Sequence, residues 1–440
     1  MEIKVFKFGG ASVNSAKGIQ NLLSILQRYR DDNILMVVSA MGKTTNALEE
    51  LLQYYMADDA VLMVDAYHRI RNYHFDILYE IFADRQHPVY SEVENLFDLL
   101  RGHLRKGHLT KGGKGVYAFE YDQIVSYGEL ISTSIIHHFL RLNGIGSSLH
   151  DARELIRTDS TFMDARVDWD MTKKLIRSAV QKHFKSTRSG KVALTQGFIG
   201  SDHEGNTTTL GREGSDFTAA IFAFSLGIKE LTIWKDVPGV MNADPKWFKN
   251  AKKIDSLSFR EAIELAYYGA SIIHPKTIKP LENANITLLV RSFVEPGQPG
   301  TRIENIKEWT ISTPIYIRKQ NQVLISISPR DFSFIVEENL SQVFKILANH
   351  QVKVNVMQNS AISFSVCVDK NHHALPLLLA ELQQNFIVRY NEDAELYTIR
   401  HYNQAAIARI SKNRKVLLEQ KTRNTVHLVV IPESQQESHI

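Results

Sequence analysis

The stretch "IKVFKFGGAS" (residues 3–12) joins a strand pattern to a pair of glycines, and it decides the expected fold. Its first six residues alternate as in a half-buried strand, Gly9 and Gly10 form a turn, and apolar residues at helical spacing follow from Ile19 to Leu26. A second apolar run, "NILMVVSAMG" (33–42), is typical of a buried strand that ends at Ser39. Strand, turn, helix and strand in this order predict a parallel sheet with helices on both faces.

Helix patterns and buried-strand patterns continue over about the first 300 residues. Residues 46–106 are mostly helical in pattern, whereas "VALTQGFIG" (192–200) and "KELTIWKDVPGV" (229–240) are typical of buried strands. A capping-box pattern and a terminal glycine predict a helix over 258–268.

A change of pattern marks the domain boundary. Pro and Gly interrupt "EPGQPGTRIEN" (295–305), and short strands alternate afterwards with two short helices, at about 338–349 and 372–385. This order is typical of small βαββαβ units. We therefore predict two domains, residues 1–305 and residues 306–440.

Composition excludes several classes of function. The chain has 440 residues, 44% hydrophobic and 23% charged, with a net charge of +4 that is too small to favour nucleic acid as a partner. The N-terminus has no signal-peptide core, and no apolar run is long enough to span a membrane. The single cysteine, Cys367, is expected to be a buried structural thiol. We expect a cytoplasmic enzyme without a membrane partner.

Two glycine-containing stretches could bind phosphate, and each has an ordinary structural explanation. Lys7 stands at a strand end before Gly9 and Gly10, where backbone N–H groups and a following helix could hold an anion. Taken alone, the stretch is explained better by a solvated lysine before a glycine turn, because Lys-x-Gly-Gly is a weak pattern. "KGHLTKGGKG" (106–115) lacks the Ser or Thr of a phosphate-binding loop and is interpreted as an exposed, flexible loop.

The stretch "TTTLGREGSDFTAA" (207–220) raises the same choice between structure and function. Ser215 or Asp216 could cap the helix that follows, but capping leaves Arg212 and the hydroxyl run unexplained. An arginine near a helix start can hold a carboxylate by two parallel hydrogen bonds, so we favour a ligand-binding loop. Glu129 of "SYGELIST" (126–133) would gain a function only beside a cationic ligand group.

The sequence shows no pattern typical of a metal site or of a catalytic Ser-His-Asp or cysteine nucleophile. The pairs His137-His138 and His372-His373 have no partner ligands at metal spacing, and we assign no metal-binding residue.

Taken together, the motifs resemble those of aspartate kinases, in the same order, from Lys4 to about Ile303. The seven motifs are "KFGGAS", "VVSAMGKTTNAL", "SYGELIST", "TQGFIG", "TTTLGREGSDFTAA", "IWKDVPGVMNADP" and "EAIELAYYGASIIHP". The resemblance implies an amino-acid kinase αβα sandwich with a mostly parallel central sheet. The C-terminal portion resembles the family's paired ACT regulatory modules, a ferredoxin-like α+β tandem region whose second module is short.

This resemblance implies a phosphotransferase whose acceptor is a carboxyl group. It would move the γ-phosphoryl group of ATP to the β-carboxylate of L-aspartate, giving 4-phospho-L-aspartate and ADP, the first step of lysine, threonine and methionine biosynthesis. Mg²⁺ would be carried with the nucleotide. A carboxylate is already nucleophilic at neutral pH, so positioning and charge neutralisation must supply the catalysis.

By the same resemblance, Lys7 would stabilise the transferring phosphoryl group and Asp216 would orient Lys7. Arg212 would hold the α-carboxylate of aspartate and Glu129 its ammonium group. Further substrate contacts would come from Ser39, Thr45 and Ser215. The nucleotide-binding residues would be Lys7, Gly9, Gly10, Lys235, Asp236, Met241, Lys246 and Ser271.

The chain departs from the family pattern mainly on the nucleotide side. The departing residues are Ala11 for Thr, Glu213 for Gly, Lys235 for Thr, Met241 for Tyr, Lys246 for Arg and Ser271 for Lys. They motivate an alternative, a catalytically weak relative that acts as a sensor or partner subunit. A glutamate or acetylglutamate kinase is a further alternative, against which the Arg212 and Glu129 pair argues.

The regulatory portion departs as well. Asn339-Leu340 replaces the Gly-Phe pair usual in lysine-sensing relatives, and Ala361 replaces an acidic residue. We therefore expect an altered lysine site, and the effector could be another amino acid. We also expect a homodimer or larger assembly formed through the ACT region.

Overall fold

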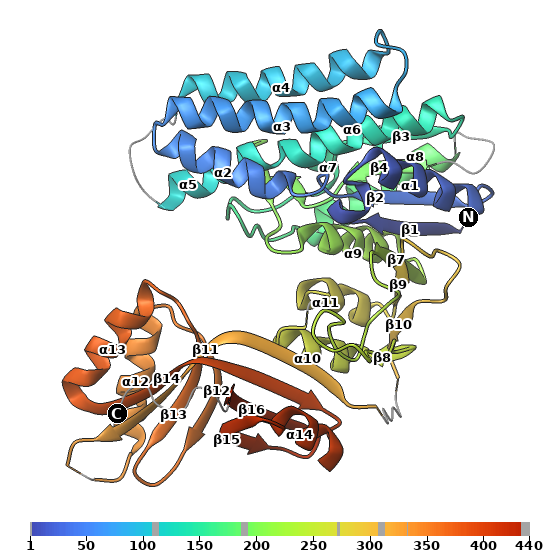
Figure 1. Cartoon of the computed structure of the whole chain (residues 1–440). Helices are drawn as coiled ribbons and strands as arrows, with labels where there is room; N and C mark the ends of the chain where they lie inside the picture. Colours follow the sequence, from blue (N-terminus) through green and yellow to red (C-terminus); the bar gives the residue numbers. More distant parts are fainter. Residues whose placement is uncertain are drawn as a thin grey trace. The chain divides into compact units, whose positions relative to one another are not determined.

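The computed structural model (Figure 1) describes residues 2–107, 114–185, 192–270, 273–306, 313–331 and 333–432. The chain divides into two compact units. Unit 1 comprises Met1–Val240, Lys253–Ile263 and Ile272–Lys307, and unit 2 comprises Met241–Lys252, Glu264–Ser271 and Glu308–Ile440. Unit 2 thus takes two short segments from before residue 305. Among the described residues, no helix combines the length and apolarity needed to cross a bilayer.

Unit 1 is built on a sheet of eight strands in the order β3-β4-β2-β1-β7-β9-β10-β8. All neighbouring strands are parallel except β9 and β10, which are antiparallel. The strands are β1 (Ile3–Phe8), β2 (Asn33–Val38), β3 (Ser147–His150), β4 (Val192–Gln196), β7 (Glu230–Lys235), β8 (Ser256–Ser258), β9 (Thr287–Ser292) and β10 (Thr301–Glu304). Two short strands, β5 (Ile199–Ser201) and β6 (Thr207–Thr209), form a separate antiparallel pair.

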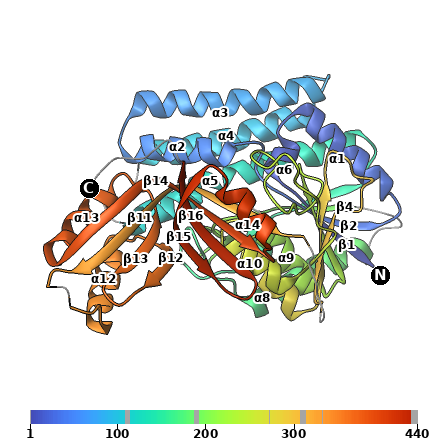
Figure 2. The ribbon, with the colours of Figure 1, turned by 60° about the horizontal axis from the view of Figure 1, so that its bottom comes forward.

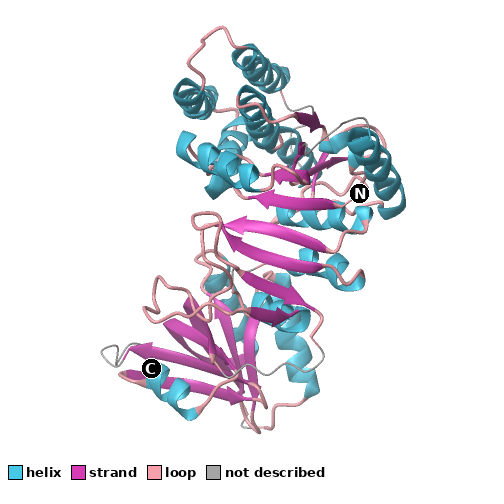
Figure 3. Ribbon diagram, turned by 90° about the vertical axis from the view of Figure 1, so that its right-hand side faces the viewer, coloured by secondary structure: helices cyan, strands magenta, loops and turns pink. Residues whose placement is uncertain are grey.

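Helices cover both faces of this sheet (Figure 3). The helices of unit 1 are η1 (Gly10–Val13), α1 (Ala16–Arg28), α2 (Thr44–Met56), α3 (Ala60–Ile81), α4 (Pro88–Lys106), α5 (Lys114–Val125), α6 (Tyr127–Leu142), α7 (Ala152–Leu155), α8 (Trp169–Lys185), α9 (Gly214–Leu226), α10 (Phe259–Tyr267), whose last residues belong to unit 2, and α11 (Pro275–Asn283). Phe6 and Phe8 of β1 pack into a core shared with α1 to α4 and α6, and α9 packs against the opposite face with α8 and α11. The long helices α3 and α4 lie side by side (Figures 1 and 2). The predicted αβα sandwich with a mostly parallel sheet is confirmed.

The parallel arrangement of the strands indicates which edge of the sheet is expected to bind a ligand. Lys7 pairs in register with Val37 of β2 and Ile233 of β7, so the carboxyl ends of these strands meet at the same edge. Ligands of open parallel sheets bind at such carboxyl ends, where the loops of neighbouring strands converge.

Unit 2 is a curled antiparallel sheet of six strands, in the order β12-β13-β11-β14-β16-β15. Its elements are β11 (Ile315–Pro329), α12 (Glu337–Asn349), β12 (Val354–Asn359), β13 (Phe364–Asp369), α13 (Ala374–Asn385), β14 (Phe386–Arg400), α14 (Gln404–Ser411), β15 (Arg414–Lys421) and β16 (Thr425–Pro432). The two helices expected from the sequence are α12 and α13, while α14 was not expected. Gln420 of β15 donates to the Met357 carbonyl of β12 at 3.0 Å, so the two edge strands approach each other. As expected, the thiol of Cys367 is fully buried, in the core enclosed by this curled sheet.

Candidate active site

A cleft of about 800 Å³ opens in unit 1 among the loops at the carboxyl edge of the sheet. The loops after β1, β2 and β7 border it, together with α6 and the start of α9. The cleft brings together nine of the residues assigned from the sequence: Lys7, Gly10, Ser39, Thr45, Glu129, Arg212, Ser215, Asp216 and Lys235. These residues are spread over more than half of the chain, so the fold alone gathers them.

Lys7, Asp216 and Lys235 form a charged cluster on one wall of the cleft. Phe6 and Phe8 face the core on the other side of the sheet, so the alternation of β1 directs Lys7 toward α9. The Lys7 Nζ lies 2.6 Å from Asp216 Oδ1, and Lys235 Nζ lies 3.6 Å from Oδ2. Burial alone would raise the pKa of Asp216, but the charges of Lys7 and Lys235 outweigh it and the net shift is downward. The carboxylate is therefore ionised and holds both ammonium groups at the cleft.

Glu129 lies in the first turn of α6 and is only 2% exposed. Its Oε1 accepts from the backbone N–H of Ala40 at 3.2 Å, whereas no hydrogen bond from the described residues reaches its Oε2. Burial raises the pKa of Glu129 to about 8, against a small opposing effect of the Ala40 N–H and of Lys7. A buried carboxylate oxygen without a donor is costly, and a cationic ligand group would satisfy it.

The raised pKa of Glu129 predicts how stability changes with pH. In the unfolded chain this carboxyl titrates near 4.5, but in the folded protein it titrates near 8. Between these values the folded state keeps a proton that the unfolded state has lost, so the free energy of unfolding falls as pH rises and levels off above pH 8. Glu129→Gln removes this slope and should stabilise the unliganded protein by on the order of 5 kcal/mol at pH 8.5, but hardly at pH 4.5.

Thermal unfolding at several pH values measures this difference. Glu154→Gln, at an exposed position on α7, is the matched control and should follow the wild type. Parallel stability curves for Glu129→Gln and the wild type would show that Glu129 is ionised in the free protein.

The start of α9 decides between capping and ligand binding for the 207–220 stretch. The N-cap is Glu213, whose side chain makes no capping hydrogen bond, and both Ser215 and Asp216 lie inside the first turn. The hypothesis that one of them caps α9 is therefore wrong. Glu213 adopts a left-handed φ of 55°, a conformation that glycine tolerates better. The exposed Arg212 makes no ion pair with any described residue, so its guanidinium is available to a ligand.

The hydroxyl run 207–209 has a structural role that sequence reasoning missed. These residues form the buried strand β6, in which Thr208 Oγ1 bonds Thr158 Oγ1 at 2.7 Å. Asp122 accepts from the N–H of Thr209 at 2.8 Å, from its hydroxyl at 2.6 Å and from the N–H of Met163 at 3.1 Å. Burial raises the pKa of Asp122 to about 6, although these bonds oppose the shift. A single acid in an otherwise ordinary helix gave no sequence signal for this role.

We expect Asp122→Asn to weaken the binding of substrate L-aspartate, although the side chain at position 122 does not contact the substrate. The amide would present N–H donors to the donors of Thr209 and Met163, and the loop that carries Arg212 would lose its anchor. The KM for aspartate should rise about fivefold to tenfold, and the free energy of unfolding should fall by about 1–3 kcal/mol. Steady-state kinetics and chemical denaturation measure both, with the exposed Asp76→Asn on α3 as control. Unchanged aspartate KM in a folded variant would contradict this role.

Close approach of two loops depends on Gly10. A Cβ at this position would lie 2.6 Å from the Ala40 carbonyl oxygen and 2.9 Å from that of Gly42, which are backbone atoms and cannot easily move. The helix expected directly behind the glycines is only the short turn η1, because α1 begins at Ala16 and is capped by Ser15. The Nζ of Lys7 lies near Gly9 instead, 3.3 Å from where a Cβ would stand.

The remaining assigned residues do not line this cleft. Asp236 is exposed beyond β7, while Met241 and Lys246 belong to unit 2. Ser271 lies outside the described residues, as does most of the 106–115 loop. His137 and His138 contact Ser147 and Glu92.

Comparison with known proteins identifies the family. Residues 2–292 match the amino acid kinase family. Lysine-sensitive aspartokinase 3 of Escherichia coli (strain K12) is 32% identical over 375 residues, which cover 84% of this chain and 78% of that relative. The chain belongs to the aspartokinase family. Aspartokinase 1, chloroplastic, of Arabidopsis thaliana is 30% identical over 375 residues, covering 83% of this chain and 63% of the plant protein.

Solved structures of aspartokinases agree with this assignment. E. coli aspartokinase III in complex with lysine and aspartate (T-state) superposes with a TM-score of 0.80 at 27% identity, covering 99% of this chain and 97% of that one. The same enzyme in complex with aspartate and ADP (R-state) gives a TM-score of 0.77 at 27% identity, with 98% and 97% covered. The chain is thus an aspartate kinase, an enzyme of amino-acid biosynthesis that uses a nucleotide. The alternatives of a sensor subunit or a different amino-acid kinase are not favoured.

Proposed function

We propose that the cleft of unit 1 holds L-aspartate beside ATP and transfers the γ-phosphoryl group to the β-carboxylate of aspartate. The observation that carries this proposal is a pair of unsatisfied groups in one cleft, one able to bind a cation and the other an anion. Glu129 offers a buried oxygen without a donor, and Arg212 offers a guanidinium without an ion pair among the described residues. An α-amino acid carries one complementary charge for each.

The aspartate end of the cleft then has a defined polarity. Arg212 holds the α-carboxylate by two parallel hydrogen bonds, and Glu129 Oε2 accepts from the ammonium. The hydroxyls of Ser39, Thr45 and Ser215 line the same cleft and supply further hydrogen bonds. With both ends of the zwitterion held, the β-carboxylate is directed toward the charged wall at Lys7.

The phosphoryl end relies on charge rather than on a proton acceptor. The β-carboxylate of aspartate is ionised at neutral pH and attacks without a general base. Lys7 neutralises charge on the transferring group, Asp216 keeps Lys7 in place, and the amides of Gly9 and Gly10 bind phosphate oxygens. We propose that Lys235 supplies the cation that relatives carry at the position of Ser271, since it lines the cleft and approaches Asp216. The roles of Asp236, Met241 and Lys246 stay predictions from the resemblance.

Mg²⁺ fits this scheme as an ion carried by the nucleotide. The described residues contain no group of three or more His, Cys, Asp or Glu side chains that could hold a metal, and Asp216 faces Lys7 and Lys235. The ion when bound offsets the charge of the triphosphate. The chain itself orients Lys7 and positions the acceptor.

Aspartate affinity is expected to rise with pH up to about 8. Binding the substrate ammonium requires ionised Glu129, which is mostly protonated below pH 8 in the free protein. Binding below that pH must release a proton, so the Kd for aspartate should increase about tenfold for each pH unit below 8. Calorimetric titration at pH 6, 7 and 8 in two buffers of different ionisation enthalpy measures both the Kd and the proton released. A Kd that stays constant from pH 6 to 8 would contradict the proton release.

An ADP-release assay tests the reaction itself. With L-aspartate and Mg-ATP at saturation, the purified chain should release ADP and form an acyl phosphate that hydroxylamine traps as a hydroxamate. L-glutamate under the same conditions should give less than about 1% of the rate, because its longer side chain displaces the carboxylate from Lys7. ADP release that does not depend on aspartate would contradict the proposal.

We further propose that unit 2 mediates dimerisation and is not tuned to lysine. Large apolar side chains are exposed near its α12 end, among them Phe334 at 70% and Ile362 at 52%. The side chain of Asn339 caps the start of α12, because its Oδ1 accepts a hydrogen bond from the N–H of Val336 at 3.0 Å. Leu340 packs against the core of unit 2. Sedimentation with and without lysine tests both points.

A further inference from the structure

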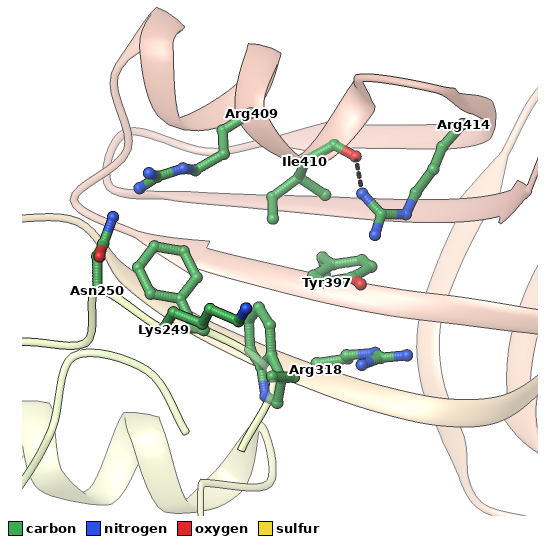
Figure 4. Close-up of a pocket in the computed structure, with 9 residues that line it drawn as sticks. Lys249, Asn250, Arg318, Tyr397, Arg409, Ile410 and Arg414 are labelled. Atoms are coloured by element: carbon green, nitrogen blue, oxygen red, sulfur yellow. Dashed lines mark hydrogen bonds between the residues drawn. The ribbon is translucent and has the colours of Figure 1, made fainter. Parts of the chain in front are cut away.

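A pocket of about 290 Å³ within unit 2 is bordered by four positively charged side chains (Figure 4). Three are arginines: Arg318 of β11, Arg409 of α14 and Arg414 at the start of β15. The fourth is Lys249, which belongs to the 241–252 segment. The phosphotransfer proposed for unit 1 gives none of these residues a role.

The charges around this pocket are not balanced by the described residues. Arg318 Nε donates to Glu395 Oε1 at 3.1 Å, and Arg414 Nε lies 3.9 Å from Oε2 of the same carboxylate. Arg409 and Lys249 form no ion pair with any described residue. Four cations against one carboxylate leave a net charge of about +3 around a small hollow. Like charges facing one cavity repel each other unless an anion lies between them.

Each arginine is held over an aromatic ring, which fixes its guanidinium plane. The Cζ atom is 4.7 Å from the Phe248 ring centre for Arg409, 5.3 Å from that of Tyr397 for Arg414, and 5.8 Å from that of Trp247 for Arg318. A contact of this kind uses the face of the guanidinium and leaves its in-plane N–H groups to polar partners. Arg318 uses two of these donors for Glu395, and Arg414 Nη1 donates to the Ile410 carbonyl at 2.8 Å, whereas Arg409 makes no hydrogen bond with a described residue. A ligand that binds such donors pays less conformational entropy than it would at flexible side chains.

We propose that this pocket binds a small organic polyanion that carries phosphate or carboxylate groups. Planar, bidentate donors from arginine match both of these groups, and the cavity is near the lower limit of small-molecule sites. Figure 4 shows Arg409 and Arg414 on one side of the pocket and Lys249 and Asn250 on the other. A polyanion bound there bridges α14 and the 241–252 segment.

The segment is already shaped to form this wall. The N–H of Asn242 donates to the Lys252 carbonyl at 2.9 Å and closes the segment into a loop. The Asn242 carbonyl accepts from the N–H of Tyr316 at 2.7 Å, which attaches the loop to β11. Phe248 packs into the core shared with Tyr316, Tyr397 and α14. Lys249 and Asn250 therefore stand on an anchored loop at the rim.

Calorimetric titration of the full chain tests this site with two probes, pyrophosphate for the phosphate class and citrate for the carboxylate class. Saturating ADP fills the proposed nucleotide site in unit 1, so that any remaining binding is independent of it. We expect at least one probe to bind, and Arg409→Gln or Lys249→Gln to weaken that binding by at least about fivefold. Both side chains are exposed and lack ion pairs with described residues, so their replacement should leave the protein folded. Quenching of Trp247 fluorescence provides a second readout.

Lys412→Gln is the matched control, since Lys412 is exposed at the end of α14 but does not line the pocket. It removes the same charge from the same region and should change the Kd less than twofold. Equal weakening by Lys412→Gln and Arg409→Gln would overturn the proposal in favour of unspecific attraction. If neither pyrophosphate nor citrate binds at concentrations up to about 10 mM, the proposal is also overturned. The site lies wholly in unit 2, so a chain that fails to phosphorylate aspartate but binds pyrophosphate through Arg409 would contradict the proposed function alone.

Discussion

Lys7→Met is expected to lower kcat about 10²- to 10³-fold while changing the KM for aspartate less than threefold. The Nζ of Lys7 is the cation held closest to Asp216, at 2.6 Å, and both side chains are nearly buried, 10% and 4% exposed. A cation fixed in such a site stabilises charge that develops on the phosphoryl group, and methionine keeps the length without the charge. Single-turnover and steady-state assays of ADP release measure the loss.

The same replacement affects folding, and a second variant separates the two effects. Without Lys7, Lys235 at 3.6 Å is the one cation among the described residues that remains paired with the buried Asp216, so we expect the free energy of unfolding to fall by about 2–3 kcal/mol. Lys7→Met combined with Asp216→Asn should recover most of this stability and none of the activity. Lys4→Met, on the same strand but paired with Asp32 outside the cleft, should keep kcat within twofold. A kcat above one-third of wild type in folded Lys7→Met would contradict the role of Lys7.

Arg212→Ala is expected to raise the KM for aspartate about 30- to 100-fold and the KM for ATP less than threefold. The side chain is exposed, lines the cleft and has no ion pair with a described residue, so its loss should hardly change the stability of the free protein. A bidentate, charge-assisted contact with the α-carboxylate is lost in both the ground state and the transition state, which mainly weakens binding. Steady-state kinetics with each substrate varied in turn measure the two constants.

Two comparisons sharpen this result. Arg212→Lys keeps the charge but not the planar fork, so its aspartate KM should fall between those of the wild type and Arg212→Ala. Arg166→Ala removes another exposed arginine, which does not line the cleft, and should change neither KM. A loss that falls on ATP instead would place the Arg212 loop at the nucleotide.

The architecture of unit 1 could be predicted because local patterns agree with the tertiary arrangement. The alternation of Ile3 to Phe8, the glycine pair and the apolar run ending at Ser39 each have one common structural explanation. Together they predicted a parallel sheet, and the structure shows that the carboxyl ends of β1 and β2 meet at a cleft lined by Lys7 and Ser39. The helices α12 and α13 followed from periodicity in the same way.

Other features depend on contacts between segments far apart in sequence. The approach of Lys235 to Asp216 and the anchoring of β6 by Asp122 join residues that no local pattern relates. Glu129 is buried, although an acid in the first turn of a helix is usually a surface group, because α6 packs against the loop after β2. Likewise, Glu213 takes the N-cap position that a capping rule would give to Ser215, since backbone geometry overrides side-chain preference there.

The most direct test is a crystal structure of the chain with L-aspartate and a non-hydrolysable ATP analogue. We predict one aspartate molecule whose α-carboxylate lies within 3.2 Å of the Arg212 guanidinium and whose ammonium lies within 3.2 Å of Glu129 Oε2, about one hydrogen-bond length in each case. Its β-carboxylate should point to the γ-phosphate beside Lys7. An aspartate that contacts only one of these two residues, or that turns its β-carboxylate away from the nucleotide, would contradict the account.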